Sequence, residues 1–129
     1  MVTEYKLYGH EVSLFSGKTR AYLRHKDIPF SESLSAENRA EIKEHIGRNV
    51  IPVVRTPSGD YLQDTTVIID ALEQQFPDKP VYPTAPFQRL VSLLMEVYAE
   101  EWLILPAMHY RWAFKRQNLL FILKEFGHA

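Results

Sequence analysis

Residues 50–69 read VIPVVRTPSGDYLQDTTVII, and the fold is decided in this stretch. The β-branched run 50–55 predicts a short strand, and the Pro-Ser-Gly-Asp sequence at 57–60 predicts a turn. Residues 61–63 then supply a hairpin partner for that strand. A helix is expected to begin at Asp64-Thr65, because both residue types are common N-caps. Its apolar stripe is expected to comprise Val67, Ile68, Ala71, Leu72 and Phe76.

The residues before this stretch alternate strand-like and helical segments. Short runs at 4–9 and 30–34 predict two strands, and residues 19–27 predict a helix between them. A further helix is expected between residues 35 and 47, with Ser35 as its N-cap. The resulting order β-α-β-α-β-β-α requires a parallel strand pair joined by a right-handed crossover, followed by antiparallel strands. The predicted fold class is therefore α/β, a thioredoxin-like mixed four-stranded sheet with helices.

The residues after this stretch predict a linker and helices, with no further strand. The segment PDKPVYPTAP at 77–86 carries four prolines and predicts a stiff, extended linker. Residues 87–105 and 107–126 predict helices, which Pro106 breaks or kinks. We therefore expect a thioredoxin-like domain over 1–76, a linker over 77–86 and a partial all-helical domain over 87–129.

The composition excludes several classes of protein. Fifteen basic and sixteen acidic residues leave a net charge of −1, which provides no overall field to attract nucleic acid or an anionic membrane. The absence of cysteine excludes a disulfide scaffold, a thiolate zinc site and a cysteine nucleophile. The five histidines show no metal-ligand spacing, so no metal site is expected. The longest apolar stretch, 102–108, is far shorter than a membrane span of about 20 residues, and a cytoplasmic protein is predicted.

Two features of the hairpin stretch suggest a ligand site. A cis bond before Pro52 would turn the backbone N–H and C=O of Ile51 outward toward a peptide-like ligand, although X-Pro bonds are usually trans. The helix that begins at Asp64-Thr65 offers backbone N–H groups to a carboxylate, and the Asp64 side chain suits an ammonium group. Together they would hold an amino-acid zwitterion, while an ordinary N-cap remains the alternative reading.

In combination, these motifs resemble the glutathione S-transferase family. The resemblance covers residues from about 4 to 90 and rests on the sequences LYG, SLFSGKTRAYL, VIPVV, LQDTTVIIDAL and FP…PVYP. It implies that Pro52 follows a cis bond and that Ile51 binds the cysteinyl backbone of glutathione. It also implies that Asp64 and Thr65 bind the γ-glutamyl end, where the family more often has Glu or Gln followed by Ser. Arg48 is a further expected contact, near the glycyl carboxylate.

The residue that activates the thiol has more than one candidate. The resemblance implies that Ser13 faces the glutathione sulfur, with Tyr8 as the rival because some classes of the family use a Tyr at the end of the first strand. Ser16 is a further alternative, and both serines also suit helix capping. Lowering a thiol pKa by about two units takes ~2.7 kcal/mol. One charge-assisted hydrogen bond (about 1.5–3 kcal/mol) and a helix N-terminus (about 0.3–2 kcal/mol) suffice without a base.

The expected function is conjugation of glutathione to an apolar electrophile. By the resemblance, an electrophile pocket is lined approximately by Tyr98, Trp102, Met108 and Trp112. The resemblance and the apolar residues on several helix faces predict a homodimer, with exchanged helices as one form of it. About 43 residues after Pro86 are fewer than the family's helical domain normally takes, which makes turnover uncertain. The alternative function is a non-catalytic transferase-like module for ligand binding or protein interaction.

Overall fold

The computed structural model describes residues 4–126, and the outer ends of the two expected domains, 1–3 and 127–129, lie outside the described residues. The chain divides into two compact units: residues 4–79 with 125–126 form the first, and residues 80–124 form the second. The boundary between Lys79 and Pro80 falls within the Pro-rich segment 77–86.

The first unit is built on a four-stranded sheet. Its strands are β1 (Tyr5–Gly9), β2 (Phe30–Leu34), β3 (Val53–Arg55) and β4 (Tyr61–Gln63), in the spatial order β2-β1-β3-β4. β1 pairs with β2 in parallel, whereas β3 pairs with both β1 and β4 in antiparallel. The mixed four-stranded sheet predicted from the sequence is confirmed.

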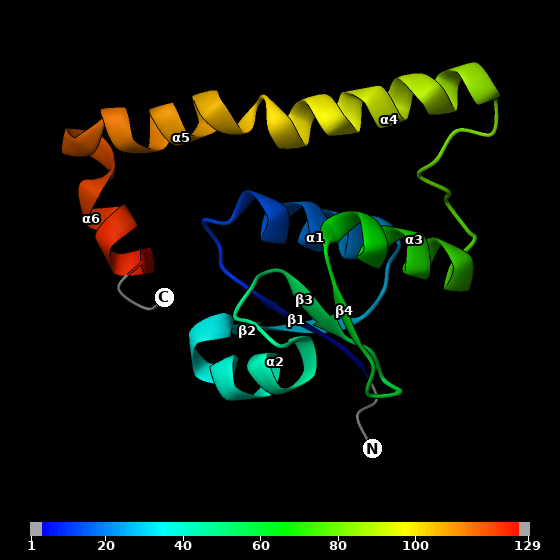
Figure 1. The fold of residues 1–129 in the computed structure, drawn as a ribbon, viewed down its shortest axis with the longest axis horizontal. Coiled ribbons are helices and arrows are strands. Elements are labelled where there is room, and N and C mark those ends of the chain that lie inside the picture. The colour runs from blue at the N-terminus through cyan, green and yellow to red at the C-terminus, as the bar shows by residue number, and fades with distance from the viewer. Residues whose placement is uncertain (1–3, 127–129) are drawn as a thin grey trace. The chain divides into compact units, whose positions relative to one another are not determined.

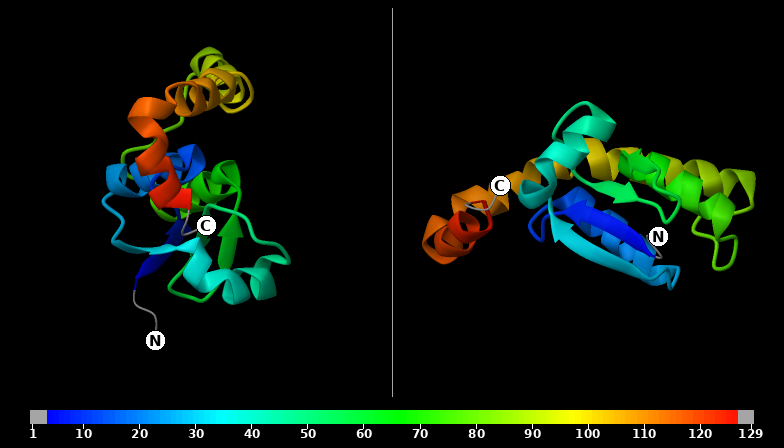
Figure 2. Two further views of the ribbon diagram at one scale, coloured as in Figure 1. Left: turned by 90° about the vertical axis from the view of Figure 1, so that its left-hand side faces the viewer. Right: turned by 90° about the horizontal axis from the view of Figure 1, so that it is seen from below.

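Helices cover both faces of this sheet (Figures 1 and 2). Helices α1 (Leu14–His25) and α3 (Thr65–Gln75) lie on one face. The 3-10 helix η1 (Ser35–Asn38) and helix α2 (Arg39–Ile46) lie on the other. This thioredoxin-like arrangement confirms the predicted fold class.

The alternation of side chains along β1 and β3 supplies a core to each face. Tyr8 pairs with Val53, and both are fully buried in one cluster with Ile42 of α2. Their neighbours Leu7 and Val54 also pair with each other and are also fully buried. Because successive side chains of a strand point to opposite faces, Leu7 and Val54 pack toward α1 and α3.

Two helix starts differ from the prediction. α1 begins at Leu14 and not near residue 19, because the Ser13 hydroxyl caps it by accepting a hydrogen bond from the Ser16 N–H. Ser35 does not cap α2, since its hydroxyl pairs with the His10 ring at 2.8 Å and a 3-10 turn precedes the helix.

The buried face of α3 (Thr65–Gln75) also differs from the apolar stripe predicted for this helix. Ile68, Ile69 and Leu72 are buried, whereas Val67 is 52% exposed. The buried face therefore keeps Ile68 and Leu72 but extends toward Ile69 and not toward Val67. In the sequence both residues are β-branched and apolar, so the stripe has no unique phase until the helix is placed on the sheet.

The second unit is helical, with α4 (Pro86–Glu101), α5 (Ile104–Ala113) and α6 (Lys115–Phe126). α4 ends before the predicted residue 105, and Pro106 lies in the first turn of α5, because a proline nitrogen has no hydrogen for a helix that would run through it. A second interruption at Phe114, which leaves helical conformation, was not predicted and coincides with no Gly or Pro. Among residues 4–126, no helix combines the length and apolar character needed to cross a membrane.

Candidate functional site

The candidate residues of the first unit lie at the edge of the sheet where β1 and β4 end and β3 begins. Tyr8 pairs with Val53, and Val53 pairs with Gln63. One residue further along this antiparallel register, Pro52 lies opposite Asp64. Helix α3 begins just after β4, and α1 begins after the short loop that follows β1, so both helices start at this edge. The start of β3 and two helix N-termini therefore lie together.

The Ile51–Pro52 peptide bond is cis. The resemblance implied this isomer, whereas the residues alone favoured trans. Pro52 is buried and Ile51 is half-buried where the chain enters β3.

Asp64 forms the N-cap of α3. Its Oδ1 accepts hydrogen bonds from the backbone N–H groups of Thr66, at 2.9 Å, and Val67, at 3.4 Å. The side chain is nevertheless exposed, and the residue has a φ of 79°, a left-handed value that Asp and Asn tolerate better than most residues. Thr65 beside it is buried. The structure thus joins an accessible carboxylate to a helix N-terminus, which suits an ammonium group next to a carboxylate.

Ser13 lies at the N-terminus of α1 and is half-buried. Its Oγ accepts from the Ser16 N–H at 3.2 Å, and its own N–H donates to the His10 carbonyl at 3.1 Å. A hydroxyl that accepts one hydrogen bond still has its own proton to donate. Ser13 can therefore donate to an anion at this helix N-terminus. Ser16 is fully buried, and its Oγ accepts from the His10 N–H at 3.3 Å.

The loop that carries Ser13 is held by an ion pair that the sequence did not reveal. Arg20 is buried in α1 and contacts Glu32 of β2 through two nitrogens, at 2.7 and 2.6 Å. The same guanidinium donates to the His10 carbonyl at 3.4 Å. Because the His10 carbonyl also accepts from the Ser13 N–H, Arg20 links β2 to the Ser13 backbone.

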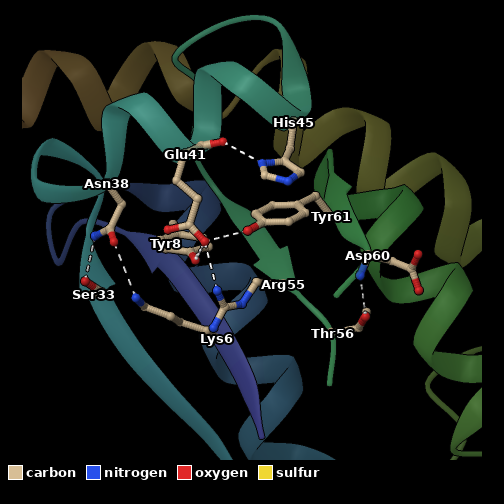
Figure 3. A network of polar contacts seen from close by, with 10 residues as sticks. All are labelled: Lys6, Tyr8, Ser33, Asn38, Glu41, His45, Arg55, Thr56, Asp60 and Tyr61. Carbon is tan, nitrogen blue, oxygen red and sulfur yellow. Dashed lines mark hydrogen bonds and ion pairs between the residues drawn. The ribbon is translucent and has the colours of Figure 1, made fainter. Parts of the chain in front are cut away.

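Tyr8 lies in a different environment. It is fully buried, and its hydroxyl donates to Glu41 Oε1 at 2.7 Å (Figure 3). Burial raises the pKa of the Tyr8 hydroxyl well above its usual range, and the hydrogen bond to Glu41 raises it further. The structure turns Tyr8 toward α2 and does not bring its hydroxyl to the edge where Ser13 and Asp64 lie.

Arg48 lies at this edge of the sheet, near the end of β4. It is exposed in the loop after α2, and its guanidinium donates to Gln63 Oε1 at 3.3 Å. Gln63 directly precedes Asp64, so Arg48 lies close to the start of α3. Sequence reasoning missed Gln63, although its position next to Asp64 was the available signal.

The four expected electrophile contacts lie in the second unit. Tyr98 belongs to α4, Trp102 follows α4, and Met108 and Trp112 belong to α5. Each pair has i, i+4 spacing, and all but Met108 are exposed. Among the residues that the structure describes, no three acidic or histidine side chains are grouped in a way that would hold a metal ion.

Comparison with known proteins relates this chain to one family. Residues 7–80 match the family model described as glutathione S-transferase, N-terminal domain. A glutathione S-transferase of Pseudomonas putida is 33% identical over 105 residues, which are 79% of this chain and 46% of that protein. The chain spans about half the length of this curated relative.

Solved structures agree with the fold. A glutathione S-transferase of Methylobacterium radiotolerans, in complex with glutathione sulfonate, is 26% identical with a TM-score of 0.67, over 76% of this chain and 47% of that one. A glutathione S-transferase of Methylobacillus flagellatus with glutathione bound has a TM-score of 0.67 at 22% identity, over 97% of this chain and 64% of that one.

Proposed function

Because the chain belongs to the glutathione S-transferase family, we propose that its first unit binds glutathione at the sheet edge formed by β3 and the starts of α1 and α3. The observation that carries the proposal is the convergence of three groups at this edge. They are the backbone of Ile51, the Asp64-Thr65 helix start and the Ser13 hydroxyl. Each group suits a different part of one tripeptide.

Each part of glutathione has a chemical match at this edge. The γ-glutamyl ammonium pairs with the Asp64 carboxylate, and the γ-glutamyl carboxylate lies at the positive end of α3, beside Thr65. The cysteinyl backbone pairs with the N–H and C=O of Ile51. The exposed guanidinium of Arg48 lies near Gln63 and supplies a cation for the glycyl carboxylate. The Methylobacterium radiotolerans relative, solved with glutathione sulfonate, supports glutathione as the ligand.

Ser13 is the residue that we assign to the thiolate. Its hydroxyl donates to the sulfur, and the N-terminus of α1 adds a favourable field. The thiolate attacks an electrophilic carbon of an apolar substrate, a C–S bond forms, and the leaving group departs with the bonding electrons. Stabilisation of the thiolate and proximity of the two substrates provide the catalysis.

The second unit contributes the remaining parts of the proposal. Tyr98, Trp102, Met108 and Trp112 provide aromatic and thioether surface for an apolar electrophile. Apolar side chains exposed in this unit favour a homodimer, among them Leu93, Leu94, Trp102 and Leu103. A cytoplasmic location remains a prediction from the sequence.

Calorimetric titration of the full chain with glutathione tests the binding site. Asp64→Asn keeps a side chain that caps helices and tolerates a positive φ, but removes the charge that pairs with the ammonium. We expect the glutathione Kd to rise about tenfold or more, since a hydrogen bond to a charged group contributes about 1.5–3 kcal/mol. Asp70→Asn, at an exposed position of the same helix, is the control and should leave the Kd unchanged.

A conjugation assay with glutathione and chlorodinitrobenzene tests the chemistry separately. Turnover that falls strongly in Ser13→Ala supports the transferase function. Glutathione binding without turnover, unchanged by Ser13→Ala, would instead favour the non-catalytic module. A chain that does not bind glutathione at neutral pH contradicts both the glutathione site and the transferase chemistry.

A further inference from the structure

Glu41 of α2 joins three strands through one carboxylate oxygen. Its Oε1 accepts from the Tyr8 hydroxyl of β1 at 2.7 Å and from the Tyr61 hydroxyl of β4 at 2.5 Å. It also accepts from the Arg55 guanidinium of β3 at 2.9 Å (Figure 3). Three donors from three neighbouring strands therefore fix the position of one residue of α2.

Apolar and aromatic contacts on the same face of α2 add to this anchor. Ile42 is 1% exposed and packs against Tyr8 in the core cluster. One turn further on, the His45 ring stacks on Tyr61 with centroids 4.0 Å apart. Ile42 is the only fully buried residue of α2, so the contacts of Glu41 and His45 carry much of the helix's attachment to the sheet.

α2 leads directly into the loop that carries two of the assigned glutathione contacts. Gly47 ends the helix with a φ of 85°, and the loop continues through Arg48 to Ile51. Val50 packs against the same core cluster that contains Ile42. The loop is thus fixed at α2 on one side and at β3 on the other, and a displacement of α2 would move Arg48 and Ile51.

We propose that Glu41 is a positioning residue for glutathione: its three hydrogen bonds hold α2 so that Arg48 and Ile51 meet the glycyl and cysteinyl parts of the tripeptide. This inference rests on the proposed function of the sheet edge. Glu41 itself points toward Tyr8, Tyr61 and Arg55 (Figure 3), and it is not among the assigned glutathione contacts. Its effect should therefore be largest at the glycyl end, which Arg48 meets, and smaller at the cysteinyl part, because Ile51 is also held by the start of β3.

The test compares two ligands and three chains by calorimetric titration. Glu41→Gln keeps the shape of the side chain but removes the charge that orders its donors. Glu44→Gln, at an exposed position of the same helix, is the matched control. The ligands are glutathione and γ-glutamylcysteine, which lacks the glycyl residue.

We expect Glu41→Gln to raise the Kd of glutathione about fivefold to tenfold and that of γ-glutamylcysteine less, because the shorter ligand loses only the contact with Ile51 and makes none with Arg48. Partial unfolding would instead lower the binding stoichiometry for both ligands alike. Equal Kd values for the wild type, Glu41→Gln and Glu44→Gln would overturn the positioning role while leaving the proposed function intact. A wild type that binds neither ligand overturns both.

A second variant keeps the test decisive if Glu41→Gln does not fold. Tyr61→Phe removes one of the three donors and leaves the ring in place against His45. A smaller rise in the glutathione Kd is expected, again with little change for γ-glutamylcysteine. Affinities identical to the wild type for both ligands would overturn the proposal.

Discussion

Asp64 combines a structural and a proposed binding role in one side chain. Its carboxylate caps α3 through the N–H groups of Thr66 and Val67, yet the residue stays exposed at the sheet edge. Its φ of 79° restricts the residue types that fit here, and Asp and Asn are among the few with a side chain that also caps. The family's more common Glu or Gln would reach further from the backbone. We infer that the shorter Asp64 side chain reaches less far toward the ligand but caps α3 better than Glu or Gln would.

Ser13 and Tyr8 are distinguished by a pair of single substitutions. We expect Ser13→Ala to raise the pKa of the bound thiol by about one to two units, because a hydrogen bond to a charged group contributes about 1.5–3 kcal/mol and one unit is 1.36 kcal/mol. Tyr8→Phe removes a hydroxyl that contacts Glu41 in the core and should leave the thiol pKa unchanged. Thiolate absorbance measured against pH checks both. A raised pKa in Tyr8→Phe alone would reverse the assignment.

Glu41 also predicts how stability depends on pH. Burial alone raises the pKa of Glu41, but hydrogen bonds from Tyr61 and Tyr8 and the charge of Arg55 outweigh it, so the pKa lies below its usual range. A carboxyl group with a lowered pKa in the folded state stabilises the fold above its unfolded pKa, about 4.3. That contribution is lost as the pH falls through the folded pKa.

We therefore expect urea denaturation to show a loss of stability below about pH 4.3 that is smaller in Glu41→Gln than in the wild type. Glu44→Gln should follow the wild type. The same acid dependence in all three chains would contradict the prediction.

At the scale of elements, α1 and α3 are joined at their C-terminal ends by Lys26. Its side chain is 1% exposed and contacts Glu73 of α3 at 2.5 Å. It also donates to the carbonyls of Phe76 and Asp78, both at 2.8 Å, where α3 has ended. A buried lysine with three oxygen partners is well satisfied, and it connects the end of α1 to the segment that leaves α3.

Removal of this lysine should destabilise the first unit. Lys26→Met leaves Glu73 without its cation, and the loss of one partner of a buried ion pair costs about 3–5 kcal/mol. Arg24→Met, at an exposed position of the same helix, should change the free energy of unfolding by about 0.5 kcal/mol or less. Chemical denaturation measures both, and equal values for the two variants would contradict the role of Lys26. The double variant Lys26→Met/Glu73→Leu should recover part of the loss.

At the scale of the whole molecule, the two units differ in how they bury apolar side chains. The first unit holds the fully buried cluster around Tyr8, Ile42 and Val53. In the second unit many large apolar side chains remain exposed, such as Leu94 at 60%, Trp102 at 64% and Leu120 at 85%. Many exposed large apolar side chains in one unit favour an interface with another protein surface.

The homodimer is tested by light scattering of the full chain at micromolar concentration. We expect a mass near twice 15.1 kDa, because association would cover the apolar surface of the second unit. Leu94→Glu places a charge on that surface and should shift the mass toward the monomer. A monomeric mass for the unmodified chain would refute the prediction.

Much of the first unit could be predicted, because local signals there were strong. The prediction of a hairpin at 50–63 was correct, since Pro57 and Gly59 mark a turn between two apolar runs. The start of α1 was placed too late, because the loop before Ser13 is held by Arg20, whose partner Glu32 lies on β2. The interruption at Phe114 was missed, because no residue type marks it.

In the candidate site too, local features could be predicted from the sequence, whereas contacts between distant residues could not. The helix start at Asp64 and Thr65 was predicted correctly, because a cap depends on the residue types at the start of an apolar helix. The network of Glu41 with Tyr8, Arg55 and Tyr61 was missed, because its members lie up to 53 positions apart along the chain and meet only when α2 packs on the sheet. Gln63 and Arg48 meet for the same reason.

The sequence by itself determined the order of the strands and helices of the first unit and the residue types at the helix starts, because turns, caps and hydrophobic periodicity act over a few residues. It also excluded any chemistry by a cysteine side chain of this sequence. Only the tertiary structure decided that Tyr8 is buried against Glu41 while Ser13 lies at a helix start on the site edge. The physical reason is that burial and hydrogen-bond partners are set by strand register and by which face of the sheet each helix covers, and distant parts of the chain fix both together.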